Sequence, residues 1–129
     1  MAVKVVHYSD VRADAVPEVE GVTIRWVIAK PDGAPHFALR VFEVQPGCAS
    51  PHHRHWWEHE LFILDGQGMA DTEEGEFRLG PGTAVLVPGG VLHQFRNVGE
   101  GLLRFICLVP HPELEGWAAA SAAPARPAC

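Results

Sequence analysis

The sequence has few cysteines, a shortage of positive charge and no long hydrophobic run, and each shortage excludes a class of protein. Its three cysteines, Cys48, Cys107 and Cys129, are scattered and odd in number. They predict no disulfide framework and favour a reducing, cytoplasmic location. Ten lysines and arginines stand against sixteen acidic residues, and the formal charge of −6 argues against nucleic acid or an anionic membrane as a partner. The N-terminus lacks a signal-peptide core, and no apolar run is long enough to span a bilayer.

Helical patterns are also scarce, whereas glycine and proline interrupt the chain roughly every eight to twelve residues, a rhythm that predicts an all-β sandwich or barrel. The 129 residues fit one domain, which we place at residues 1–116, followed by an Ala/Pro-rich tail at 117–129. Only residues 113–120 have a pattern that allows a turn or two of helix. The expected strands cover residues 3–8, 21–29, 37–44, 60–64, 69–72, 77–79, 84–87, 92–97 and 102–109.

Alternation within these strands predicts which side chains face the interior. One face of residues 21–29 carries four apolar residues, Val22, Ile24, Trp26 and Ile28. Residues 37–44 place Arg40 and Glu43 on opposite faces. In the last strand the face with Arg104 is expected to be the outer one, so Phe105 and Cys107 would line the interior. Whether these two belong to the core or to a pocket stays open, because free cysteine is among the most buried residue types.

Half of the eight histidines fall within eight residues, at His52, His53, His55 and His59. Imidazole is the commonest metal ligand in proteins, and it binds in its neutral form. His53, His55 and His59 have the same parity, so a regular strand would project all three rings from one face. The stretch therefore predicts three converging imidazoles.

Residues 82–97 predict a strand, a tight turn and a second strand that carries His93. Pro88 presets φ, and Gly89 and Gly90 allow the positive φ values that a hairpin turn needs. His93 would then enter the same site from a different strand.

Together the two stretches resemble the paired motifs of the cupin superfamily. The second stretch fits the family pattern G-x5-P-x-G-x2-H-x3-N at Gly82, Pro88, Gly90, His93 and Asn97. The first stretch, residues 47–66, fits G-x5-H-x-H at Gly47, His53 and His55 and closes on Gly66. The resemblance covers roughly residues 37–110 and implies a double-stranded β-helix, the jelly-roll barrel.

The resemblance also implies a metal site, but the fourth ligand departs from the glutamate that is usual in the family. His59 stands at that place, with Glu58 and Glu60 on either side. His59 keeps both the strand parity and the usual interval to Gly66. We therefore favour a four-histidine site, His53, His55, His59 and His93. A bulge after Trp56 would turn Glu60 inward instead, so Glu60 is the competitor of His59.

Such a site would hold one divalent transition metal per chain. The family resemblance favours Mn, and imidazole also suits Fe, Zn, Ni and Cu. Four neutral imidazoles leave the ion its full positive charge, which makes it a strong Lewis acid. The candidate pocket residues are Arg40, Trp56, Phe105 and Cys107. Arg40, if inward, would pair with an anionic substrate, while Trp56 and Trp57 either close the mouth of the site or pack as core.

Two classes of function fit these residues. The first is a metal-dependent enzyme on a small-molecule substrate, dioxygenase-like, with isomerase or lyase chemistry on a sugar-like acid as the alternative. The second is a module that binds a metal or small ligand without turnover. A regulator normally carries an attached DNA-binding domain, for which 129 residues leave no room.

Residues 62–64 and 102–103 are apolar on both strand faces, which predicts that something covers the outer face of the sheet. We expect a homodimer in which residues 22–28 contribute the cover. A monomer whose own N-terminal segment folds over the sheet is the alternative.

Overall fold

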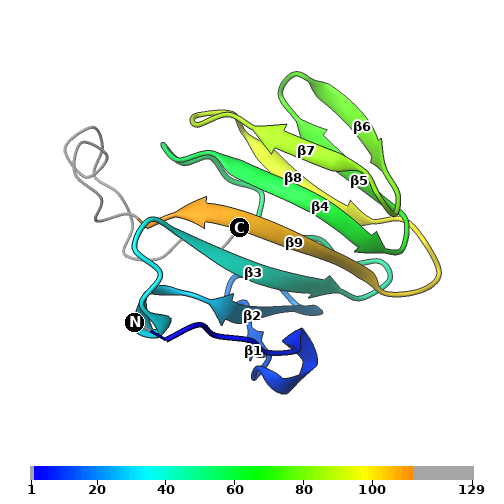
Figure 1. Ribbon diagram of the computed structural model, residues 1–129. Coiled ribbons are helices and arrows are strands. Elements are labelled where there is room, and N and C mark those ends of the chain that lie inside the picture. The colour runs from blue at the N-terminus through cyan, green and yellow to red at the C-terminus, as the bar shows by residue number, and fades with distance from the viewer. Residues whose placement is uncertain (1, 112–129) are drawn as a thin grey trace.

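The computed structural model describes residues 2–111, which form two antiparallel β-sheets (Figure 1). The larger sheet has the strand order β1-β2-β3-β9-β4-β7, and the smaller has the order β6-β5-β8. The strands are β1 Asp14–Ala15, β2 Val22–Ile28, β3 Phe37–Val44, β4 His59–Asp65, β5 Gly68–Thr72, β6 Gly75–Leu79, β7 Ala84–Val87, β8 His93–Asn97 and β9 Leu103–Pro110. Two short 3-10 helices, η1 Tyr8–Asp10 and η2 Lys30–Asp32, complete these elements. The predicted all-β fold, a double-stranded β-helix, is confirmed.

Two of the predicted features concern other parts of the chain. The helical turn expected at residues 113–120 and the tail at 117–129 lie outside the described residues. Within residues 2–111, no helix is long and apolar enough to cross a membrane.

Aromatic and branched side chains from both sheets fill the space between them. β9 alternates between buried and half-buried residues along its whole length, because successive side chains of a strand point to opposite faces. Its buried residues are Leu103, Phe105, Cys107 and Val109. Phe105 stacks on Phe42, with 5.3 Å between the ring centroids, and meets Phe95 at 5.6 Å. The inward face predicted for the last strand is confirmed, and Phe105 is a core residue.

β2 shows where simple alternation fails. Val22 and Ile24 are buried as expected, but a register shift between Trp26 and Ile28 brings Val27 into the core instead. A bulge adds one residue to a strand and exchanges its two faces beyond that point. The prediction that Ile28 shares the face of Val22 was therefore wrong.

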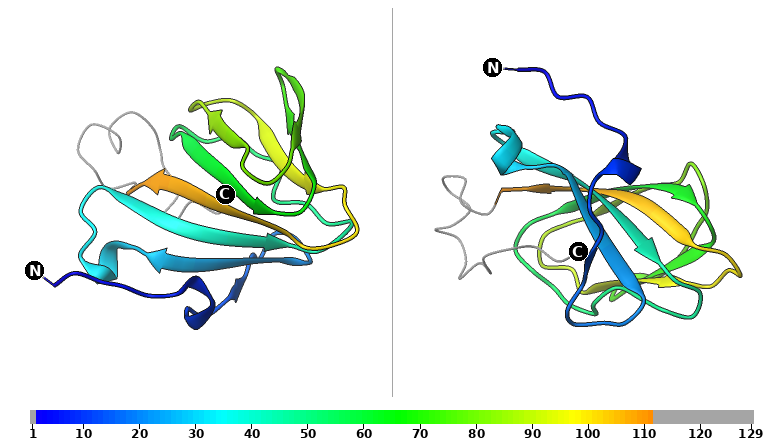
Figure 2. Two further views of the ribbon diagram at one scale, coloured as in Figure 1. Left: turned by 45° about the vertical axis from the view of Figure 1, so that its right-hand side comes forward. Right: turned by 90° about the horizontal axis from the view of Figure 1, so that it is seen from below.

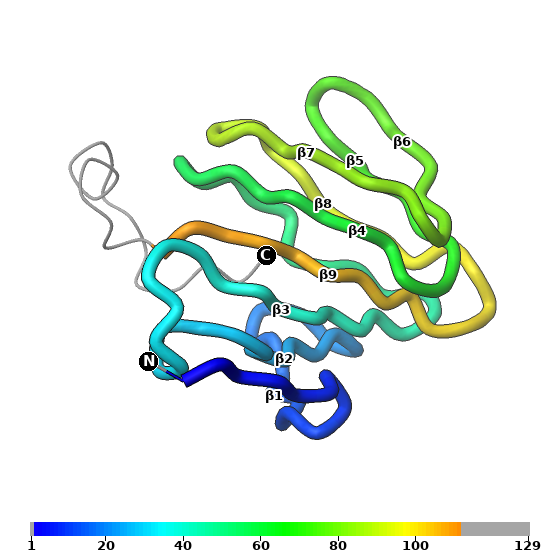
Figure 3. The backbone as a smooth tube through the Cα atoms, viewed as in Figure 1, coloured from blue at the N-terminus to red at the C-terminus, as the bar shows by residue number. Residues whose placement is uncertain are grey.

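The strand expected at residues 3–8 was also wrong, since β1 is the first strand of residues 2–111. Val3 and Val5 are 90% and 91% exposed, so their alternation with polar residues has no apolar surface to match. β1 pairs with β2 at its edge instead. The N-terminal segment runs beside β2 (Figure 3). The Lys4 ammonium donates a hydrogen bond to the Val27 carbonyl there, at 2.9 Å.

The outer face of β4 and β7 exposes large apolar side chains. Phe62 is 46% exposed and Leu86 is 61% exposed. The N-terminal segment packs elsewhere on the large sheet (Figure 2). There, the Arg25 guanidinium donates to the Val11 carbonyl at 2.6 Å, and the guanidinium of Arg104 lies 5.3 Å from the centre of the Tyr8 ring. The N-terminal segment, which we considered as a cover of the outer face, thus leaves the apolar strip of Phe62 and Leu86 open.

Two glycines of the motifs offer a matched test of this packing. Gly66 and Gly82 both have left-handed φ angles, +91° and +87°. A Cβ atom on Gly66 would lie 2.4 Å from the Leu102 carbonyl oxygen, whereas a Cβ on Gly82 would meet nothing within 4 Å. Gly82→Ala should therefore cost only the left-handed strain of about 1–2 kcal/mol. Gly66→Ala should cost about 1–3 kcal/mol more, because backbone of the neighbouring strand must move. Urea unfolding followed by circular dichroism measures both, and equal losses would contradict this packing.

Candidate metal centre

Four imidazoles converge at one end of the barrel. His53, His55, His59 and His93 each offer one ring nitrogen, and these four atoms all lie within 4.8 Å of one another. His59 is the first residue of β4 and His93 the first residue of β8, and both are fully buried. His53 and His55 are half-buried and come from the segment between β3 and β4.

The backbone brings the two motifs together. The amide of His53 donates to the carbonyl of His93 at 3.1 Å, and the amide of His93 donates back to the carbonyl of His53 at 3.0 Å. Further along β8, the amide of Ser50 donates to the carbonyl of Phe95 at 2.9 Å. Residues 48–53 therefore run beside β8 as an irregular additional strand.

The regular strand expected from His53 to His59 is interrupted. Only His53 forms a β-bridge, and the chain bends at Trp56 and Trp57 before β4 begins. The Trp57 ring is buried and stacks on His55, with 4.1 Å between ring centroids and 6° between planes. The three histidines thus converge through a folded loop rather than through parity along one strand.

The hairpin turn between β7 and β8 shapes this loop. The Gly90 amide donates to the His55 carbonyl at 2.7 Å. A Cβ atom on Gly89 would lie 2.1 Å from the Trp56 carbonyl oxygen, so only glycine allows the two backbones to approach. Sequence reasoning assigned the glycine pair to turn geometry, and Gly90 does have a φ of +86°. It missed the second role, close contact with the ligand loop.

Backbone carbonyls fix the tautomers of two of the rings. The His55 Nδ1 lies 3.0 Å from the Trp57 carbonyl oxygen, and the His93 Nδ1 lies 2.9 Å from the Val91 carbonyl oxygen. A carbonyl oxygen only accepts, so each Nδ1 carries the hydrogen and each Nε2 carries the lone pair with which an imidazole binds metal. Neutral imidazoles oriented in this way are the usual ligands of transition metals.

The distances also suit one ion. Metal–imidazole bonds of about 2.0–2.1 Å place adjacent ligand atoms about 3 Å apart and opposite ones about 4 Å apart. The Nε2 atoms of His55 and His59 are 2.8 Å apart, and the whole group stays within 4.8 Å. The four residues therefore fit a transition-metal ion.

The fourth ring, His59, has a side chain behind it instead of a carbonyl. Its Nδ1 lies 3.2 Å from the Cys107 sulfur, and Arg40 Nη2 donates to the same sulfur at 3.1 Å. All three residues are fully buried. Burial raises the pKa of the Cys107 thiol, and the positive charge of Arg40 partly opposes that rise. The inward position predicted for Cys107 is confirmed, and Arg40, whose face was left open, also points inward, but both lie behind a histidine ring.

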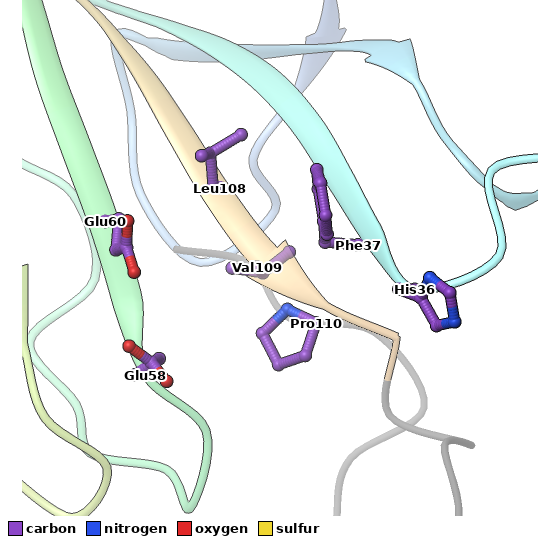
Figure 4. A pocket seen from close by; sticks show the side chains of 7 residues that line it. All are labelled: His36, Phe37, Glu58, Glu60, Leu108, Val109 and Pro110. Atoms are coloured by element: carbon purple, nitrogen blue, oxygen red, sulfur yellow. The ribbon is translucent and has the colours of Figure 1, made fainter.

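The glutamates beside His59 point away from the imidazoles. Glu58 and Glu60 are exposed, whereas His59 is buried, as alternation along β4 requires. Both carboxylates line a pocket of about 320 Å³ on the outer surface, whose other residues are His36, Phe37, Leu108, Val109 and Pro110 (Figure 4). Among the remaining pocket candidates, half-buried Trp56 packs against the core.

The fold and the convergent imidazoles define a class of small β-barrel proteins with a histidine centre. Residues 40–109 match the family model described as a cupin domain, and the chain therefore belongs to the cupin family. Its structure resembles that of the polyketide cyclase RemF from Streptomyces resistomycificus, with a TM-score of 0.79 and 36% identity over 84% of this chain and 80% of that one.

Two curated relatives match over shorter stretches. A 1-methylthio-D-xylulose 5-phosphate methylsulfurylase of Rhodospirillum rubrum is 39% identical over 71 residues, which are 55% of this chain and 46% of the relative. An acireductone dioxygenase of Rhodopseudomonas palustris is 31% identical over 71 residues, 52% of this chain and 42% of the relative. The chain thus spans less than half the length of either.

Metal analysis of three variants tests the ligand set. His59→Ala should lose most of the bound metal, because it removes one of four ligands. Glu60→Gln should keep its metal, because the Glu60 carboxylate is on the outer face. His52→Ala is the control, since His52 is an exposed neighbour outside the group. Elemental analysis of purified protein, with circular dichroism to confirm folding, gives the result. Loss of metal in Glu60→Gln with retention in His59→Ala would assign the fourth ligand to Glu60.

Proposed function

We propose that this cupin binds one divalent transition-metal ion through His53, His55, His59 and His93, and that the loaded protein is an enzyme. The convergence of the four ring nitrogens within 4.8 Å carries the proposal. Manganese is our first choice, on the family resemblance, and Fe, Zn, Ni and Cu are the other ions that imidazole suits. An ion held by four neutral ligands keeps its positive charge and supplies Lewis-acid chemistry.

The protein's own residues prepare this centre. The carbonyls of Trp57 and Val91 hold the rings of His55 and His93 with Nε2 pointing inward. The indole of Trp57 covers one face of His55 and shields that ring from water. Arg40 brings a positive charge into the interior, between the Trp26 ring at 5.2 Å and the Phe42 ring at 5.0 Å. That charge favours substrates with an anionic group or a developing negative charge on oxygen.

For the reaction, we propose dioxygenase-like oxidation of a small organic substrate. The similarity to acireductone dioxygenase, 31% over 71 residues, supports this choice. Redox-neutral chemistry, such as isomerisation or lyase chemistry on a sugar-like acid, is the second candidate. The match to a polyketide cyclase over 84% of the chain favours it, because cyclisation needs no oxidant.

We also propose a cytoplasmic location and a homodimer. Cys48 and Cys107 are free cysteines, which suits a reducing compartment. A second copy of the chain is the partner that we propose for the apolar strip of Phe62 and Leu86, since β7 is the last strand of its sheet and continues the strip to an edge.

Substrate turnover tests the enzyme proposal. Protein loaded with Mn²⁺ or Fe²⁺ is given a panel of enediols, sugar acids and small aromatic ketones, while dissolved oxygen and substrate are followed together. Oxygen uptake that matches substrate loss supports the dioxygenase, and substrate loss without oxygen uptake supports redox-neutral chemistry. His93→Ala is the control for metal dependence. Tight metal or ligand binding with no turnover of any compound would reassign the chain to the non-catalytic binding modules.

Light scattering tests the dimer. The wild-type chain should show twice its mass of 14.1 kDa at micromolar concentration. Combined Phe62→Ser and Leu86→Ser substitutions should give a monomer, because they remove apolar area from the proposed interface. Phe77→Ser is the matched control, as Phe77 is 52% exposed but belongs to β6 of the smaller sheet. A monomeric wild type would count against this interface. So would a loss of the dimer in Phe77→Ser as large as that in the double variant.

A further inference from the structure

The Nδ1 atom of His59 contacts a different kind of group from the Nδ1 atoms of His55 and His93. His55 and His93 each place Nδ1 against a backbone carbonyl, which only accepts hydrogen bonds. His59 places Nδ1 against the sulfur of Cys107 at 3.2 Å. A thiol can both donate and accept, so Cys107 sets no single tautomer for His59.

The other ring nitrogen of His59 faces the ligand group. Its Nε2 lies 2.8 Å from the Nε2 of His55, which is the spacing of two adjacent ligands on one ion. An imidazole that ligates through Nε2 has no hydrogen there, so its hydrogen is on Nδ1. In His59 that nitrogen faces the Cys107 sulfur.

The sulfur of Cys107 can serve this tautomer. It accepts a hydrogen bond from Nδ1–H, while the hydrogen of the thiol turns away from the ring. Such a bond holds the ring of His59 with Nε2 directed at the ligand group.

Arg40 holds the sulfur in place. Its Nη2 donates to the sulfur at 3.1 Å, and Arg40 and Cys107 are paired residues on neighbouring strands β3 and β9. Cys107 is not a member of the ligand group, and it contacts the ring nitrogen of His59 that faces away from His55. Its position therefore suits support of a ligand rather than ligation.

We propose that Cys107 is a positioning residue for His59, accepting a hydrogen bond from Nδ1–H when His59 binds metal through Nε2. This inference rests on the proposed function, because it needs a metal ion at the four histidines.

The direct readout is the position of the hydrogen on His59. Nitrogen-15 NMR of the histidine side chains, with His59→Ala used to assign the signals, distinguishes Nε2–H from Nδ1–H. We expect Nδ1–H on His59 in the wild type loaded with Zn²⁺, which is diamagnetic. An Nε2–H signal on His59 in the loaded protein would overturn the proposal.

Affinity for Zn²⁺, measured by competition with a chelator, is the second readout. Cys107→Ala should weaken binding about 10- to 100-fold, the usual effect of losing a partner behind a ligand. Cys107→Ser should retain most of the affinity, because a hydroxyl also donates and accepts. Arg40→Met should weaken binding in the same direction as Cys107→Ala.

Val109→Ala is the matched control. Val109 is 2% exposed on the same face of β9, two residues from Cys107, so its truncation leaves a cavity but keeps the thiol. Its Zn²⁺ affinity should equal that of the wild type, and an equal loss in Val109→Ala and Cys107→Ala would show that packing alone is responsible. A wild type that binds neither Zn²⁺ nor Mn²⁺ would refute the proposed function and this inference with it. A wild type that binds Zn²⁺ no more tightly than Cys107→Ala would refute the inference alone.

Discussion

The reciprocal backbone hydrogen bonds between His53 and His93 are the interaction on which the centre depends. They join residues forty positions apart in the chain and place two ligand-bearing segments side by side. Since the donors and acceptors are main-chain groups, the pairing survives any change of side chain that keeps the backbone conformation. The Gly89–Gly90 turn adds a third backbone contact, to the loop of His55 and Trp56. Hydrogen bonds between backbone groups thus orient the segments that carry the ligand side chains.

The sequence predicted those parts of the fold that follow from local alternation. In β9, each residue has the burial that a period of two requires, because partner strands on both sides hold it regular. At the edge of the same sheet the prediction failed. Residues 3–8 alternate but have no strand to pair with, and the bulge at Val27 exchanges the faces of β2. Both errors concern pairing between strands, which alternation within one strand does not encode.

The candidate site divides in a similar way. The histidine spacing pointed to the four residues that converge, because each motif carries its ligands within a few positions. The sequence did not predict the contact of Cys107 with His59, because this contact depends on the register that pairs Arg40 with Cys107 across β3 and β9. Parity placed Cys107 inside the barrel and left the face of Arg40 open. Even with both residues inside, a register shift of two positions would break their contact. A bulge after Trp56 was considered, but the stacking of Trp57 on His55 was not, because it is a tertiary contact that spacing does not encode.

The distribution of charge connects this architecture to the chemistry we propose. Every member of the ligand group is a neutral imidazole, the buried cation Arg40 lies behind one of them, and the glutamates nearest in sequence face outward. A divalent ion bound there would add to the positive charge of a poorly solvated interior. Unbalanced buried charge is unfavourable by several kcal/mol, of the order found for isolated ions in protein interiors. An anionic substrate, or a water that gives up a proton, offsets that charge. The arrangement therefore favours reactions in which negative charge builds up on an oxygen atom, and this property is common to both reaction classes that we propose.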